Sequence, residues 1–186
     1  MKRKWAVSFC FFLVLGRAAL VDRIAVTVAQ DAITESEVLE EIRVTSFLNN
    51  EPADFSAPAR RAAAERLVDQ YLIRHELATG SYPQLDAARA DQLLRDFEKQ
   101  HFRRHAELEQ KLKQYGISTE DLKQHLLFQA AAIQFTELRF SSGPRNEADR
   151  TAPGAAPPPS VDEQLDSWLK QVRGQTRIEF KKEAFQ

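Results

Sequence analysis

The chain has very little cysteine and glycine. Its 186 residues include one cysteine, Cys10, and six glycines. Cys10 lies in an apolar N-terminal segment, so the sequence downstream of it can form no disulfide and offers no thiol chemistry. The few glycines form neither a Gly-rich phosphate loop nor a nucleophile elbow. These absences favour a binding protein over an enzyme of those classes.

The chain also lacks an apolar run long enough to span a bilayer. The N-terminal apolar run covers only residues 5–15, whereas a spanning helix needs about 20 apolar residues. Three basic residues precede this run and small residues follow it. The pattern predicts a secretory signal peptide over residues 1–18, cleaved after Ala18, with an uncleaved anchor as the alternative. Lipidation is not expected, because Phe9 precedes Cys10 where a lipoprotein signal has a small residue.

Positive charge is in deficit once this segment is removed. The remaining 168 residues carry 22 basic and 27 acidic side chains, a net charge of −5. Nucleic acid is therefore disfavoured as a partner, since contacts to its phosphates need clustered Lys and Arg. The length suits one domain with its own core. Because a signal peptide is predicted, we expect the protein in the periplasm or another exported compartment.

The pattern of apolar residues predicts a mainly α-helical fold. Ile24, Val26 and Val28 alternate with other residues as in a half-buried strand, and Thr34 with Glu37 forms a capping box that opens the first helix. Five helices are expected in this part of the chain: a first to about residue 48, a second from Pro58 to Gly80, a third over about 85–104, a fourth ending at Gly116, and a fifth from Ser118 or Thr119 to Gly143.

The C-terminal part begins after a proline-rich segment. Residues 142–160 hold five prolines and predict a flexible or extended Pro/Ala-rich linker. A helix over 161–173 follows, then a short strand at Ile178–Phe180. Since a lone hairpin is marginal in water, we expect this strand to pair with the N-terminal one, although residues 175–186 could instead fray as a tail. Residues 161–186 would then complete the domain that residues 19–141 begin, with a small β-sheet formed by the N- and C-terminal strands.

Three segments carry a family resemblance. They are DRIAVTVAQDAITESEV at 22–38, YGISTEDLKQHLLFQAAAIQFTELRF at 115–140 and LDSWLKQVRGQTRIEF at 165–180. The first resembles the start of mature SurA-type periplasmic chaperones, the second the last long helix of their N-terminal domain, and the third the helix and strand that complete that domain. The resemblance implies a helical domain that binds unfolded outer-membrane proteins.

The resemblance does not extend to catalysis. In that family, parvulin-type prolyl isomerase domains are commonly inserted before the C-terminal helix, but residues 142–160 are far too few to form one. We therefore expect non-catalytic binding of unfolded or assembling envelope proteins. Two alternatives stay open: an isomerase-related protein whose catalytic part is absent or supplied by another chain, and a structural subunit for one fixed envelope partner.

Other side-chain patterns offer little chemistry. His101 and His105 stand four residues apart, as metal ligands on one helix face can, but no further ligands are evident and no metal or cofactor is predicted. His75-Glu76 does not begin a zincin motif, because Thr79 occupies the position of its second histidine. The acidic pair Glu40-Glu41 is interpreted as part of a solvated helix surface.

A chaperone of this kind needs an apolar groove between helices. Any single apolar residue on these helices is more often part of the core than of such a groove. The candidate client-binding residues are Tyr71, Leu72, Phe97, Leu126, Ile133 and Phe135.

Overall fold

The structure is a computed structural model that describes residues 22–141 and 159–186. Its elements are β1 (Ile24–Val28), β2 (Asp31–Thr34), α1 (Glu35–Asn49), α2 (Ala57–Thr79), α3 (Ala87–His101), α4 (His105–Tyr115), α5 (Thr119–Thr136), a π-helical turn (Glu137–Ser141), α6 (Val161–Gln175), β3 (Ile178–Phe180) and a 3₁₀-helix (Lys182–Phe185). The predicted fold class, mainly α with a small sheet, is confirmed. The predicted signal peptide, residues 1–18, lies outside the described residues, and so does the predicted linker, residues 142–160, except for its last two residues.

The sheet joins the two ends of the described chain. It has the order β2-β1-β3 and both pairings are antiparallel. Val26 lies opposite Ile33 on one side and Phe180 on the other, so the expected pairing of N- and C-terminal strands is confirmed. The prediction missed β2, which pairs with β1 as a hairpin immediately before α1.

The alternation predicted for β1 is wrong at its first residue. The register with β2 is irregular between Ile24 and Val26, and such an irregularity changes which face a side chain occupies. As a result Ile24 is 46% exposed whereas Ala25 is buried. Val26 and Val28 point into the core, as expected.

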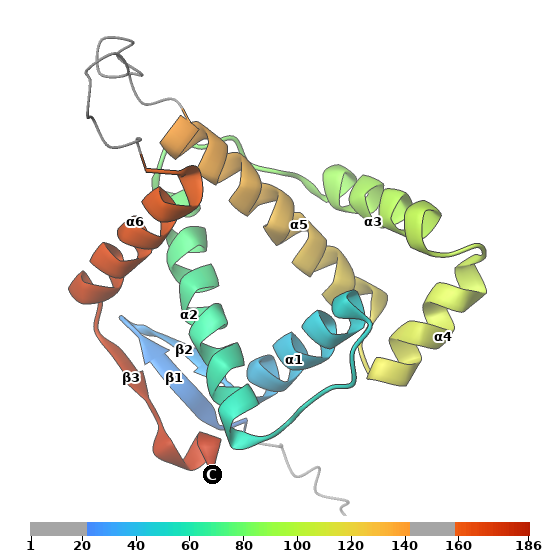
Figure 1. The fold of residues 1–186 in the computed structure, drawn as a ribbon, viewed down its shortest axis with the longest axis horizontal. Coiled ribbons are helices and arrows are strands. Elements are labelled where there is room, and N and C mark those ends of the chain that lie inside the picture. Colours follow the sequence, from blue (N-terminus) through green and yellow to red (C-terminus); the bar gives the residue numbers. More distant parts are fainter. Residues whose placement is uncertain (1–21, 142–158) are drawn as a thin grey trace, which may run out of the picture.

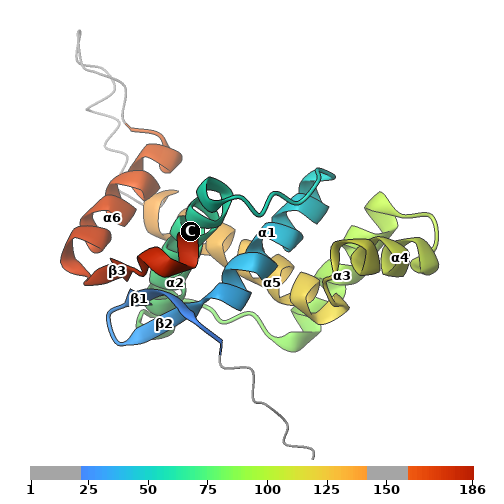
Figure 2. The same ribbon diagram turned by 90° about the horizontal axis from the view of Figure 1, so that it is seen from below.

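The first hydrophobic cluster lies between the sheet and helices α1 and α2. Thr34 and Glu37 form the predicted capping box at the start of α1, and Ser56 caps α2 with Pro58 in its first turn. The buried members are Ala25, Val26, Val28, Ile33, Val38, Ile42, Ala63, Ala64, Val68, Leu72 and Ala184. Figure 2 shows this sheet at one end of the molecule, with α3 and α4 at the other.

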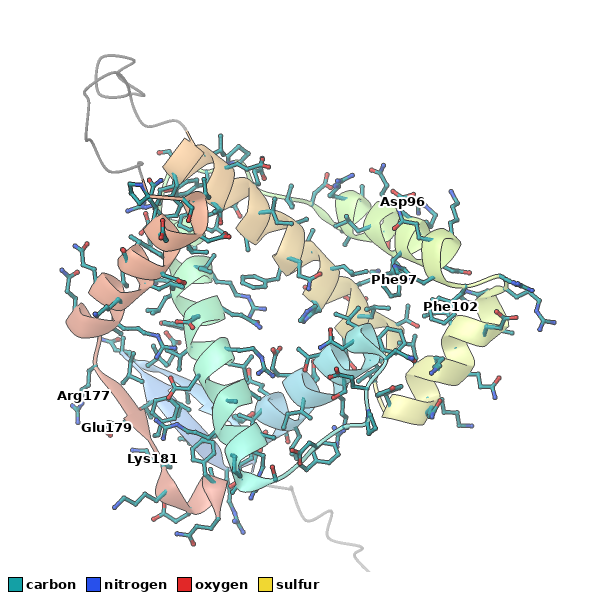
Figure 3. The ribbon with its side chains drawn as sticks, viewed as in Figure 1. Asp96, Phe97, Phe102, Arg177, Glu179 and Lys181 are labelled. Carbon is teal, nitrogen blue, oxygen red and sulfur yellow. The ribbon has the colours of Figure 1, made fainter. Side chains whose placement is uncertain are left out.

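Two further clusters hold the remaining helices. One packs α1 against α4 and the start of α5 around Phe47, whose ring contacts those of Phe97, Phe102 and Tyr115. Figure 3 labels Phe97 and Phe102, whose rings contact each other where α3 is followed by α4. The other packs the end of α5 against α6 and α2, around Phe135 and Trp168, with ring centroids 5.1 Å apart.

The C-terminal segment is an integral part of the fold, so the alternative of a fraying tail is wrong. Arg173 on α6 reaches α2, where its Nε lies 2.6 Å from Asp69 Oδ1 and its Nη1 lies 2.7 Å from Glu65 Oε2. Ala184 in the final 3₁₀-helix is buried in the first cluster. Helix α6 also continues through Gly174, before which the prediction had ended it, because Gly174 does not adopt the left-handed conformation with which glycine ends a helix.

The outer edge of β3 carries alternating charges. Arg177, Glu179 and Lys181 project away from the molecule in Figure 3. The two cations hold the pKa of Glu179 down to about 2. Charges on an edge strand disfavour pairing with a strand of another molecule.

A candidate binding groove between α2 and α5

Helices α1, α2 and α5 outline a triangle in Figure 1, and the space between α2 and α5 contains two adjoining cavities. A polar chamber of about 120 Å³ lies at the α1 end. A more apolar cleft of about 390 Å³ lies farther along α2 and α5. Arg74 and Gln124 line both cavities. The two cavities therefore adjoin, and we call them together the α2–α5 groove.

The polar chamber is organised by one buried carboxylate, Glu41 of α1. Its side chain is only 4% exposed. Arg66 Nε donates to its Oε1 at 3.0 Å and Gln70 Nε2 donates to its Oε2 at 3.1 Å. Burying a carboxylate is tolerable only when it is paired and hydrogen-bonded in this way. The interpretation of Glu40-Glu41 as a solvated pair is thus wrong for Glu41.

His125 of α5 completes the chamber. Its Nδ1 lies 3.9 Å from Glu41 Oε2, and its Nε2 lies 3.1 Å from Gln129 Nε2. Burial lowers the pKa of His125, and the positive charges of Arg74 and Arg66 lower it further, although Glu41 opposes them. The imidazole is therefore neutral at neutral pH.

The acidic rim of the chamber is only partly neutralised. Burial raises the pKa of Glu40, and the neighbouring carboxylates of Asp121 and Glu37 raise it further. The gathered carboxylates make the α1 end of the groove locally acidic. A cationic or hydrogen-bond-donating group would be favoured there.

The cleft beyond the chamber is lined by apolar side chains from three parts of the chain, together with the polar side chains of Arg74, Gln84 and Gln124. Leu77 comes from α2, Leu85 from the segment before α3, and Leu127 and Phe128 from α5. Its volume lies within the range of about 300–1,000 Å³ that ligand-binding clefts occupy. The cleft can therefore cover apolar side chains of an extended peptide.

Arg74 stands where the cleft meets the chamber. Its guanidinium carbon lies 4.6 Å from the centre of the Phe128 ring. The side chain of Arg74 reaches solvent, but the surrounding walls of the groove remove part of its hydration, and this desolvation lowers its pKa. The carboxylates of Glu41 and Glu37 act in the opposite direction. Arg74 remains charged and can donate to backbone carbonyls of a bound chain.

The six residues predicted from the sequence to bind clients do not line this groove. Leu72 is buried in the first cluster, and Tyr71 packs against it while its hydroxyl donates to Asp31. Phe97 and Leu126 lie together in the second cluster. Phe135 is fully buried in the third cluster, whereas Ile133 is 60% exposed on α5. Tyr71 and Leu72 thus share one cluster and Phe97 and Leu126 share another. The structure does not gather all six residues at one site.

The sequence did contain a signal for the groove. Leu126, Leu127 and Phe128 are consecutive, so their side chains spread over more than one face of α5. Leu126 faces the second cluster, and Leu127 and Phe128 face the cleft. An apolar run wider than one helix stripe indicates a second apolar surface.

The remaining histidines are not gathered at this site. The ring of His101 packs on Phe97, and His105 pairs with Glu98 and Glu109. The described residues contain no group of three or more potential ligands placed to hold a metal ion. Among the helices in residues 22–141 and 159–186, none has the length and apolar character needed to cross a membrane.

Comparison of the chain with models of known families and with curated proteins finds no match. The groove itself, with the sequence resemblance described above, is therefore the basis for a functional proposal.

Proposed function

We propose that this protein is an exported, non-catalytic binder of unfolded or assembling envelope proteins, and that outer-membrane proteins are its main clients. The observation that carries the proposal is the α2–α5 groove, an open cleft with apolar walls beside a polar chamber. An unfolded chain binds through burial of apolar side chains and needs no specific catalytic group. The resemblance to SurA-type chaperones supports the same function.

The groove has features suited to an extended chain. Leu77, Leu85 and Leu127 offer apolar contact. Arg74 supplies a donor for backbone carbonyls at one end of that surface. Such a site would accept many sequences, as a chaperone requires.

A site-specific photo-crosslinker can test this proposal. Ala78 is exposed on α2 and lines the cleft, whereas Ala62 is exposed on the same helix and lies outside it. We expect a photoreactive residue at position 78 to crosslink a purified, unfolded outer-membrane barrel protein, and not its folded form. The same residue at position 62 should give few adducts.

The pattern of adducts separates the open alternatives. Equal crosslinking at both positions would contradict the groove as the binding site. In cells, a single stoichiometric adduct at position 78 would favour the fixed-partner function, whereas a range of non-native envelope proteins would favour a chaperone.

A further inference from the structure

A second cavity, separate from the α2–α5 groove, opens where α1 and α4 end. It has a volume of about 550 Å³. Arg43 of α1 and Lys111 and Lys113 of α4 supply its charge, and Pro52, Phe55 and Tyr115 supply most of its apolar wall. Figure 1 shows the end of α1, the connection to α2 and the end of α4 meeting at this place. We propose that this basic pocket binds an acidic peptide segment that carries an apolar side chain beside its carboxylates.

The cations of the pocket have no carboxylate partners in the part of the chain that the structure describes. None of Arg43, Lys111 and Lys113 forms an ion pair there. Lys111 Nζ instead donates to Asn50 Oδ1 at 3.0 Å. Glu51 and Asp54 lie on the adjoining connection but do not line the cavity. Asp54 is engaged with the backbone and side chain of Ser56.

The carbonyl ends of α1 and α4 cannot neutralise this charge. Each helix C-terminus contributes about half a negative charge, so two of them offset about one of the three cations. All the charged side chains that line the cavity are cations, in a protein whose predicted mature chain carries −5. An anionic occupant is therefore electrostatically favoured at this place and disfavoured over the surface as a whole.

The apolar wall adds a second requirement. Phe55 is 43% exposed, and the guanidinium carbon of Arg43 lies 5.7 Å from the centre of its ring. Apolar and cationic surfaces thus alternate within one cavity. A ligand with both carboxylates and an apolar side chain would cover the ring and pair with the cations.

The pocket is held in shape by both helix ends. Asn50 and Gly116 end α1 and α4 in the left-handed conformation, with φ of 54° and 68°. Tyr115 Oη donates to the carbonyl of Glu51 at 3.0 Å and fixes the connection to α4. A preformed site lowers the entropic cost of binding. Nucleic acid is a poorer fit, because its binding needs a larger basic surface than three side chains provide.

The experiment measures fluorescence anisotropy of three short labelled peptides. One carries aspartates on both sides of a phenylalanine, the second has asparagines in place of the aspartates, and the third has glycine in place of the phenylalanine. The first should bind the intact protein most tightly, and added salt should weaken its binding. The double variant Lys111→Glu/Lys113→Glu should weaken it about tenfold, since two attractive charge pairs with the peptide are replaced by repulsion.

Lys170→Glu is a control for charge reversal outside the pocket, because Lys170 is exposed on α6 and forms no ion pair in the described residues. It should leave the affinity nearly unchanged, and all variants should melt like the wild type. Equal binding of the asparagine peptide, or equal loss in Lys170→Glu, would overturn the proposal. Full displacement of the peptide by inorganic phosphate at matched ionic strength would reduce the pocket to a simple anion site and overturn it as well.

Discussion

Glu41 is the residue on which the junction of α1, α2 and α5 depends. It lies one position before Ile42 on the buried face of α1, yet it carries a charge. Arg66 and Gln70 of α2 satisfy its two oxygens, and His125 of α5 lies beyond them. A single side chain therefore links the three helices that frame the groove.

Glu41→Ala should lower the free energy of unfolding by about 1–3 kcal/mol, because Gln70 and Arg66 lose a charged acceptor in a partly buried place. Urea unfolding of the variant and the wild type measures the difference. Glu109→Ala is the control, since Glu109 is 64% exposed and pairs only with His105. It should cost under about 1 kcal/mol, and equal losses in the two variants would contradict the role given to Glu41.

His125 should make stability depend on pH. Its pKa in the folded protein is lowered below 6.5 by burial, with Arg74 and Arg66 acting in the same direction and Glu41 against them. The unfolded chain therefore binds a proton first as the pH falls. Unfolding then becomes easier below about pH 6.5.

Urea midpoints across this pH range, in the wild type and in His125→Gln, isolate the effect. The wild type should lose stability relative to the variant as the pH falls through this window. Exposed His105 acts in the opposite direction, because Glu98 raises its pKa, but it is present in both proteins and cancels. Parallel curves would contradict a lowered pKa for His125.

At the scale of elements, α6 joins the C-terminal part of the chain to the rest. Trp168 is 8% exposed and packs against Phe135, while Arg173 fixes the helix to α2. Residues of α2 such as Arg74 and Leu77 line the groove. Helix α6 contacts other residues of α2, among them Asp69. The position of α2 in the groove thus depends partly on α6.

Trp168→Ala should lower the free energy of unfolding by about 3–5 kcal/mol, because the surrounding rings cannot close the space it leaves. That loss is comparable to the lower end of total domain stability. Chemical denaturation followed by circular dichroism measures it. Lys170→Ala, on the exposed side of the same helix, should change stability by less than about 0.5 kcal/mol. A cooperative transition at the wild-type midpoint for Trp168→Ala would show that α6 does not belong to the core.

The helices were predictable because their ends carry local signals. Thr34 and Ser118 open capping boxes, and Gly116 ends α4. Strand β2 was not predictable in the same way, since Asp31–Thr34 is only four residues long and has a turn-forming residue at one end and the helix-capping Thr34 at the other. It pairs because β1 lies beside it. The run Leu126–Phe128 indicates a second apolar surface on α5, but the cleft itself was not predictable, because its walls also come from α2 and the segment before α3. Their convergence is a tertiary property.

At the scale of the whole molecule, two sequence-distant ends form one sheet, and the helices between them frame the groove. Pairing of β1 with β3 places α6 against α2. The described residues before the linker end with the π-helical turn at Glu137–Ser141, and α6 begins at Val161. The described residues that line the groove all lie between Glu37 and Ala131, in the part of the chain before α6.

The central claim is that the α2–α5 groove holds non-native chains, and light scattering of an unfolded outer-membrane barrel protein diluted from denaturant tests it most directly. The wild-type protein should suppress the scattering. Leu85→Asp, which places a charge in the apolar cleft, should suppress it much less, whereas Leu138→Asp should act like the wild type because Leu138 is exposed outside the cleft. Both variants should keep the wild-type melting transition. Equal suppression by wild type and Leu85→Asp, or none by the wild type, would contradict the claim.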